Sequence, residues 1–159
     1  MEFKNMFKKK IELFSPVNGK VVSLKEVPDK VFASQMMGPG IAFKFTESTI
    51  FSPCEGKVTL IPSTLHAIGI TAKNGAEVLI HIGVDTVNLN GKGFEKLVSQ
   101  GDVVNIGDPI IRVNQEVITN MGYNLITPMV ITNSKSYHIS INVKENVRVG
   151  DSVGVIIKG

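Results

Sequence analysis

Two histidines in the middle of the chain, His66 and His81, each lie within a run of small and apolar residues. The runs cover residues 62–70 and 77–87 and are rich in β-branched residues, which predicts two neighbouring buried strands joined by a Lys-Asn-Gly turn. An imidazole inside a protein needs a hydrogen-bond partner, so two of them on adjacent strands indicate a site. With Asp85 close behind, such a pair suits either phosphoryl transfer or metal binding.

Phosphoryl transfer through histidine requires a neutral ring nitrogen as nucleophile, aimed by a hydrogen bond at the other ring nitrogen. It also requires a donor to the charged phosphoryl oxygens, in a site that excludes water. Gly83 follows His81 by two residues, and because it has no side chain its carbonyl can approach that ring. Thr64 precedes His66 by two residues, the same-face spacing of a strand, so its hydroxyl can orient the second imidazole.

Two other interpretations of the histidines stay open at this point. Either both are ordinary core histidines with satisfied hydrogen bonds, or His66, His81 and Asp85 hold the zinc ion of a hydrolase, with water as the fourth ligand. The sequence has no His-x-His or His-Glu-x-x-His motif and no obvious general base, which disfavours the hydrolase. We expect no resident cofactor, and a zinc ion bridging the two imidazoles would be incidental.

Length and composition fit one globular domain. The chain has 159 residues, of which 43% are hydrophobic and 19% charged. The single cysteine, Cys54, excludes an internal disulfide and favours a reducing compartment. No run approaches the roughly 18 apolar residues of a membrane span, and no signal peptide is recognisable. We therefore expect a cytoplasmic protein.

The net charge of +3 arises in the N-terminal segment. The first ten residues hold four lysines and one glutamate, and the rest of the chain is balanced, so no nucleic-acid-binding surface is expected. Apolar residues recur there at helical spacing, namely Phe3, Met6, Phe7, Ile11 and Phe14. We interpret residues 1–13 as a basic amphipathic tail, either a frayed arm or a weak contact with anionic lipid at the inner face of the membrane.

Residues 14–159 read as a single all-β domain. Turn signals containing glycine recur between short runs rich in valine and isoleucine, which predicts an antiparallel β-sandwich or a barrel-like sheet. Only residues 94–100 and 115–121 suit a turn or two of helix. Two segments are repeated: residues 14–21 recur as 51–58, and residues 104–110 recur as 147–153. The repeats predict a sheet folded from two related halves.

A series of motifs runs through the chain in unbroken order between residues 14 and 133. It includes Phe14-Ser-Pro-Val-Asn-Gly-Lys-Val21, His66-Ala-Ile-Gly-Ile70, Leu79-Ile-His-Ile-Gly-Val-Asp-Thr-Val87 and Thr127-Pro-Met-Val-Ile-Thr-Asn133. The series resembles the glucose-family IIA component of the bacterial phosphoenolpyruvate-dependent sugar phosphotransferase system. The resemblance implies an antiparallel β-sandwich and the activity of a phosphotransferase in sugar transport.

The resemblance also implies a role for each site residue. The histidine matching His81 accepts a phosphoryl group at Nε2 from the phosphocarrier protein HPr and passes it to a cysteine on the IIB domain of a sugar permease. The histidine matching His66 stabilises the phosphoryl group, and the threonine matching Thr64 orients that second ring. A role as a regulatory module, binding other proteins through the same face, is a further implication and an alternative to transport.

Partner contacts follow from the same resemblance. Asp29 and Asp85 match aspartates that flank the site and meet basic residues of the partners, whereas Val31, Phe32 and Val87 match an apolar ring that excludes water and forms the docking face. Three positions depart from the family pattern near the site, namely Pro39, Leu65 and Asn88.

Overall fold

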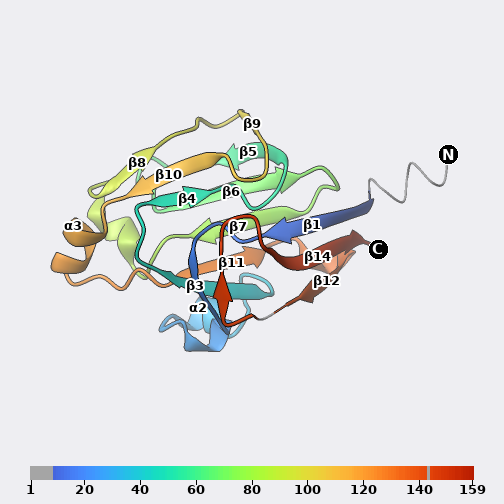
Figure 1. Cartoon of the computed structure of the whole chain (residues 1–159), viewed down its shortest axis with the longest axis horizontal. Coiled ribbons are helices and arrows are strands. Elements are labelled where there is room, and N and C mark those ends of the chain that lie inside the picture. Colours follow the sequence, from blue (N-terminus) through green and yellow to red (C-terminus); the bar gives the residue numbers. More distant parts are fainter. Residues whose placement is uncertain (1–8, 143) are drawn as a thin grey trace.

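The computed structural model of the chain describes residues 9–142 and 144–159, which fold into a β-sandwich (Figure 1). The strands are β1 (Lys10–Phe14), β2 (Gly19–Val22), β3 (Gly40–Phe45), β4 (Thr49–Phe51), β5 (Gly56–Leu60), β6 (Ala67–Ala72), β7 (Glu77–His81), β8 (Phe94–Lys96), β9 (Val103–Val104), β10 (Pro109–Val113), β11 (Thr127–Ile131), β12 (Tyr137–Ile141), β13 (Asn146–Val147) and β14 (Ser152–Lys158). The α-helices are α2 (Lys30–Ala33) and α3 (Gln115–Asn120), and the 3₁₀ helices are η1 (Leu24–Glu26), η2 (Thr86–Leu89) and η3 (Ser134–Ser136).

The largest sheet has the strand order β13-β2-β3-β11-β7-β6-β5-β9, and every pair in it is antiparallel. Two three-stranded sheets, β1-β14-β12 and β4-β10-β8, pack against it across the main core. The prediction of an antiparallel β-sandwich is therefore confirmed. The barrel-like alternative is wrong, because the end strands β13 and β9 do not pair with each other in the part of the chain that the structure describes.

The two helical predictions had different outcomes. Residues 115–120 form α3 at one end of the molecule (Figure 1), where the side chain of Asn114 accepts a hydrogen bond from the Val117 N–H and caps the first turn. The prediction of a helical turn at 94–100 is wrong, because Phe94–Lys96 is strand β8. Glu95 lies opposite Arg112 of β10 and forms an ion pair with it, a cross-strand partner that local spacing does not reveal.

The predicted boundary of the tail at residue 13 falls inside a strand. Lys10–Phe14 is β1, which pairs with β14, and Leu13 is buried in the main core. The apparent helical spacing of Ile11 and Phe14 is therefore wrong, because both residues belong to a strand that its partner fixes. Residues 1–8, the remainder of the predicted tail, lie outside the described residues. No helix in the described ranges has the length and apolar character needed to span a membrane.

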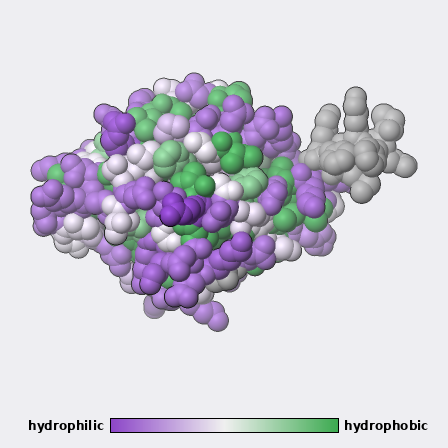
Figure 2. All heavy atoms as spheres, in the orientation of Figure 1, coloured by the Kyte–Doolittle hydropathy of each residue, from purple (hydrophilic) through white to green (hydrophobic). Residues whose placement is uncertain are grey.

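Apolar side chains fill both faces of the large sheet. Val78 and Ile80 of β7 point into the main core, whereas Leu79 belongs to a second, smaller cluster on the opposite face. Because side chains alternate along a strand, His81 shares the face of Leu79. The segment with η1 and α2 covers this second cluster below β3 (Figure 1), and hydrophilic residues cover most of the visible surface, with apolar residues in patches between them (Figure 2).

The predicted repeat has a structural counterpart in the large sheet. Its two halves correspond strand by strand from the edges to the centre: β13, β2, β3 and β11 in one half correspond to β9, β5, β6 and β7 in the other. The register agrees, because Gly19 pairs with Val147 in the first half and Gly56 pairs with Val104 in the second. Gly19 corresponds to Gly56, and Val147 corresponds to Val104, in the repeated sequences. The two halves therefore share the same strand pairing at equivalent residues.

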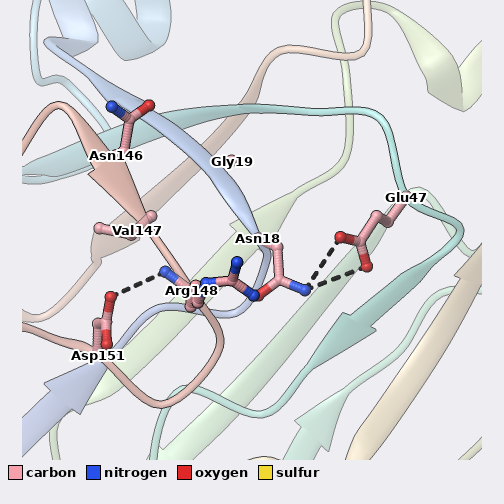
Figure 3. Close-up of a pocket in the computed structure, with 7 residues that line it drawn as sticks. All are labelled: Asn18, Gly19, Glu47, Asn146, Val147, Arg148 and Asp151. Atoms are coloured by element: carbon pink, nitrogen blue, oxygen red, sulfur yellow. Dashed lines mark hydrogen bonds between the residues drawn. The ribbon is translucent and has the colours of Figure 1, made fainter.

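The turns of the repeat also use the same hydrogen bonds. The Asp151 carboxylate accepts from the Arg148 N–H at 2.9 Å (Figure 3), and the Asp108 carboxylate accepts from the Asn105 N–H at 2.7 Å. A polar hollow of about 440 Å³ lies beside the first of these turns, and it is lined by Asn18, Gly19, Glu47, Asn146, Val147, Arg148 and Asp151. It lies where β2 meets β13, three strands away from the strand that carries His81.

Candidate active site

The two histidines meet where their strands end on the same side of the sheet. His81 is the last residue of β7, and His66 immediately precedes β6. The ring centroids are 5.0 Å apart, and the rings meet edge to face at 79°. Ala67 is paired with His81, so the register of the two strands sets this distance. Both histidines are partly buried.

The strands are shorter than the sequence predicted. Residues 62–66 form a turn in which Leu65 has φ +57°, and the chain after His81 turns through Gly83 and Asp85, with φ of +82° and +58°. These left-handed conformations cannot continue a strand. The histidines therefore lie at the end of the β6-β7 pair, beside two turns and not in its middle, which argues against the interpretation as ordinary core histidines.

A backbone carbonyl holds the His81 ring. The Nδ1 atom lies 2.8 Å from the Gly83 carbonyl oxygen, and because a carbonyl only accepts, Nδ1 carries the proton. The lone pair of the neutral ring is then on Nε2, which is the atom available as a nucleophile. A side chain at Gly83 would oppose this geometry, since a Cβ would lie 2.9 Å from the Asn124 carbonyl oxygen and 2.7 Å from Cγ2 of Thr86.

A hydroxyl holds the His66 ring. Thr64 Oγ1 lies 2.7 Å from Nδ1 of His66. When the hydroxyl donates, Nδ1 accepts and the proton of the neutral ring is on Nε2, which then acts as a donor. The contact forms across the turn at Leu65, not along a strand as the spacing had suggested. The two rings thus offer one nucleophilic nitrogen and one N–H donor.

Burial lowers the pKa of both imidazoles. For His66, burial is the main cause and the neighbouring His81 adds to it. For His81, burial is again the main cause, and the Gly83 carbonyl and the charges of Asp29 and Asp85 oppose it in part. Both rings are therefore neutral over a wider pH range than free histidine, as a histidine nucleophile and a neutral N–H donor require.

The predicted partner-binding residues divide into three groups. Val31 and Val87 are exposed at the surface, at 40% and 43%. Phe32 is buried, and its ring centroid lies 4.9 Å from that of His81, so it forms a wall of the site and offers little surface to a partner. Asp29 and Asp85 lie close enough to influence the His81 charge.

Sequence reasoning missed an apolar hollow on the face of the sheet that carries His81. It measures about 360 Å³, and its lining includes Met37, Leu60 and Leu79. The alternation of β7 places Leu79 on the same face as His81, and this pattern is the signal that could have revealed it. Leu60 is 48% exposed and lies opposite Gly69, a pairing that only the fold discloses.

The three departures from the family pattern occupy distinct places. Pro39 precedes β3, and its carbonyl accepts a hydrogen bond from the Ile131 N–H at 3.0 Å. Leu65 occupies the left-handed position between Thr64 and His66. Asn88 is exposed on η2.

A three-ligand metal centre is not formed by the residues at this site. Among residues 9–142 and 144–159, no three His, Cys, Asp or Glu side chains come together in an arrangement that could hold a metal ion. Asp85 therefore does not complete a zinc triad with His66 and His81, and the hydrolase interpretation loses its ligand set.

The family model described as "phosphoenolpyruvate-dependent sugar phosphotransferase system, EIIA 1" matches residues 11–137. The chain belongs to this family. It is therefore an EIIA component, a phosphocarrier of the sugar phosphotransferase system, and such components are transferases that act in sugar transport. None of the comparisons favours a zinc hydrolase.

Individual relatives of this EIIA chain cover nearly its whole length. The glucose-specific EIIA component of Staphylococcus epidermidis is 44% identical over 151 residues, which are 95% of this chain and 86% of the relative. The same component of Staphylococcus aureus is 44% identical and covers 97% of this chain and 96% of the relative. In structure, the EIIA chain is similar to glucose permease IIA from Mycoplasma capricolum, with a TM-score of 0.88 and 35% identity over 94% of this chain and 97% of that one.

Proposed function

We propose that this EIIA chain carries its phosphoryl group on Nε2 of His81, taking it from phospho-HPr and passing it to the IIB domain of a sugar permease. The observation that supports this most directly is the 2.8 Å contact between Nδ1 of His81 and the Gly83 carbonyl. The contact assigns the proton to Nδ1 and the lone pair to Nε2. His81 therefore has the geometry of an aimed nucleophile.

Each transfer balances without a further reactant. The Nε2 lone pair of His81 attacks phosphorus, the P–N bond of the donor breaks, and its electron pair returns to the donor imidazole. In the second transfer, a thiolate of the IIB domain attacks phosphorus and the electron pair returns to Nε2. The proton stays on Nδ1 of His81 throughout, hydrogen-bonded to the Gly83 carbonyl oxygen, so the ring keeps one orientation in both steps.

His66 has the role of stabilising the group in transit. With Thr64 donating to Nδ1, the His66 Nε2–H can donate to a phosphoryl oxygen on the neighbouring ring, whose centroid is 5.0 Å away. Charge develops on those oxygens during transfer, and a pre-positioned donor in a half-buried site lowers the barrier.

The partners would dock on the exposed residues around the histidines. Val31 and Val87 supply apolar contact, and Asp29 and Asp85 supply negative charge that attracts basic residues of a partner. A small, partly apolar interface suits a protein that must release each partner after one transfer. We infer action in the cytoplasm, with weak membrane contact by the part of residues 1–13 that precedes β1. We also infer that the protein has no resident cofactor and that zinc at the two imidazoles would be incidental. Regulatory binding of other proteins to the dephosphorylated form would use the same face.

Phosphorylation mapping tests the assignment. The chain, incubated with phosphoenolpyruvate, Enzyme I and HPr, should gain one acid-labile phosphoryl group, and His81→Ala should abolish labelling. His66→Gln should accept the group but pass it to a IIB domain poorly. His138 is exposed on β12, outside the site, so His138→Gln is the matched control and should behave as wild type. Loss of labelling in His66→Gln with normal labelling in His81→Ala would reverse the two roles.

A further inference from the structure

Asp29 makes a contact that its expected role as a partner-binding charge does not use. It is the N-cap of α2, and its Oδ1 accepts a hydrogen bond from the Val31 N–H at 3.0 Å. Its backbone carbonyl accepts from the Ala33 N–H at 2.9 Å. The aspartate therefore holds the first turn of this helix with both its side chain and its main chain.

The helix depends on such contacts because it is short. Four residues cannot form a stable helix alone, and Asp is among the best N-cap residues. The residue that α2 contributes to the interior is Phe32, which is 4% exposed. The position of the Phe32 ring therefore depends on the capped turn that Asp29 begins.

Three groups fix the His81 ring. The Gly83 carbonyl binds Nδ1, the His66 ring meets it at 79°, and the Phe32 ring packs against it with centroids 4.9 Å apart. The hydrogen bond at Nδ1 fixes one atom, and the two neighbouring rings limit rotation about that atom. The direction in which Nε2 points is set by all three.

We propose that Asp29 is a positioning residue for phosphoryl transfer: its carboxylate caps α2 and so keeps the Phe32 ring against the His81 ring, which aims Nε2 at the incoming phosphorus. The proposal rests on the proposed function of His81. It adds to the charge of Asp29 a structural contribution to the transfer step itself.

Asp85 provides a natural contrast within the same site. It also lies near His81 and begins a short helix, η2, but its side chain makes no capping hydrogen bond. Asp85 therefore supplies charge without positioning, whereas Asp29 supplies both.

Four variants separate the two contributions. Asp29→Asn and Asp29→Ser keep a capping side chain and lose the charge, and Asp29→Ala loses both. Asp85→Asn removes charge alone, because asparagine tolerates the left-handed φ of +58° at this position. Steady-state transfer from phospho-HPr gives kcat and KM for each variant. For Asp29→Asn, Asp29→Ser and the Asp85 variant, we expect a raised KM and an unchanged kcat, because these variants lose only charge. For Asp29→Ala, we expect a raised KM and in addition a kcat about fivefold lower than that of the wild type. Equal kcat in the alanine and asparagine variants of Asp29 would overturn the proposal.

A second readout is independent of catalysis. The NMR chemical shifts of the His81 ring protons depend on the adjacent Phe32 ring. In Asp29→Ala these shifts should therefore approach the values found in Phe32→Leu, whereas in Asp29→Asn they should stay at the wild-type values. The effects of Asp29→Ala and Phe32→Leu on kcat should not add, because both act through one contact. If phosphate were mapped to another residue, the proposed function would fail while the shifts still reported the positioning. If His81 were labelled but the shifts stayed unchanged, only the positioning would fail.

Discussion

Ala67 lies directly opposite His81 in the antiparallel pair of β6 and β7. The next residue toward the N-terminus is His66, whose carbonyl accepts a hydrogen bond from the Ile82 N–H at 2.7 Å. The backbone ladder therefore continues one step beyond the strands and ties the two histidine segments together. Since a sheet fixes the separation of its strands, the imidazoles are held in place before any partner arrives.

Replacing Thr64 by valine should slow phosphoryl transfer without preventing phosphorylation. Valine keeps the shape of threonine but removes the hydroxyl that lies 2.7 Å from Nδ1 of His66. One net hydrogen bond of about 1 kcal/mol corresponds to a roughly fivefold slower transfer. Single-turnover transfer to a IIB domain measures the rate, and Thr64→Ser should restore most of it. A rate equal to wild type in the valine variant would contradict the orienting role.

Replacing Gly83 by alanine should lower the free energy of unfolding by about 1–3 kcal/mol, because the residue has positive φ and a Cβ would press on its neighbours. The control is Gly107→Ala, which has the same φ of +82° and nothing within 4 Å of the added Cβ. Urea unfolding of both variants separates crowding from conformation. Only the Gly83 variant should also slow phosphorylation of His81, and equal losses in both would remove the crowding argument.

Stability should fall on acidification because of the histidine pair. The native pKa of both His66 and His81 lies below the ordinary 6.5, so the unfolded state binds protons first as the pH drops. The free energy of unfolding should therefore be highest above pH 6.5 and decline from there until the native rings also protonate. Urea unfolding between pH 8 and 5 measures the slope, and a double variant with glutamine at both positions should show a shallower decline. An identical slope would refute the assignment.

Cys54 should resist thiol reagents in the folded protein. The side chain is 1% exposed, and burial raises the pKa of its thiol to about 12. Thiolate is the reactive form, so almost none is present at pH 8. Reaction of the folded protein with dithionitrobenzoate should be limited by the rate at which local or global unfolding exposes the thiol. In guanidinium, where the protein is unfolded, the same reaction should be immediate. Rapid reaction of the folded protein would show that the site is accessible.

The sequence predicts the fold class and the site because both depend on local patterns. Alternating short apolar runs and glycine turns indicate a sandwich, and the repeat of residues 14–21 as 51–58 indicates its two halves. The two-residue spacings of Thr64 from His66 and of Gly83 from His81 identify the hydrogen-bond partners that the structure contains.

Other features depend on tertiary contacts and are not readable locally. The left-handed backbone at Leu65 and Asp85 ends the predicted strands early, and neither residue type requires that conformation. Phe94 reads as helical because its strand partner lies in a distant segment, β10. The resemblance places Phe32 in an apolar ring that forms the docking face, and only the fold shows that α2 turns its side chain inward against His81.

The two related halves of the large sheet place other residues at the positions that correspond to the histidines. Val130 pairs with Gly40 as His81 pairs with Ala67, and the Pro39 carbonyl accepts from the Ile131 N–H as that of His66 accepts from Ile82. The strand pair β6-β7 thus carries the two histidines, whereas the corresponding pair β3-β11 has Pro39 and Val130 at the matching register positions. Only one half of the large sheet therefore has imidazoles at this register, and the matching positions in the other half have no side chain that could carry a phosphoryl group.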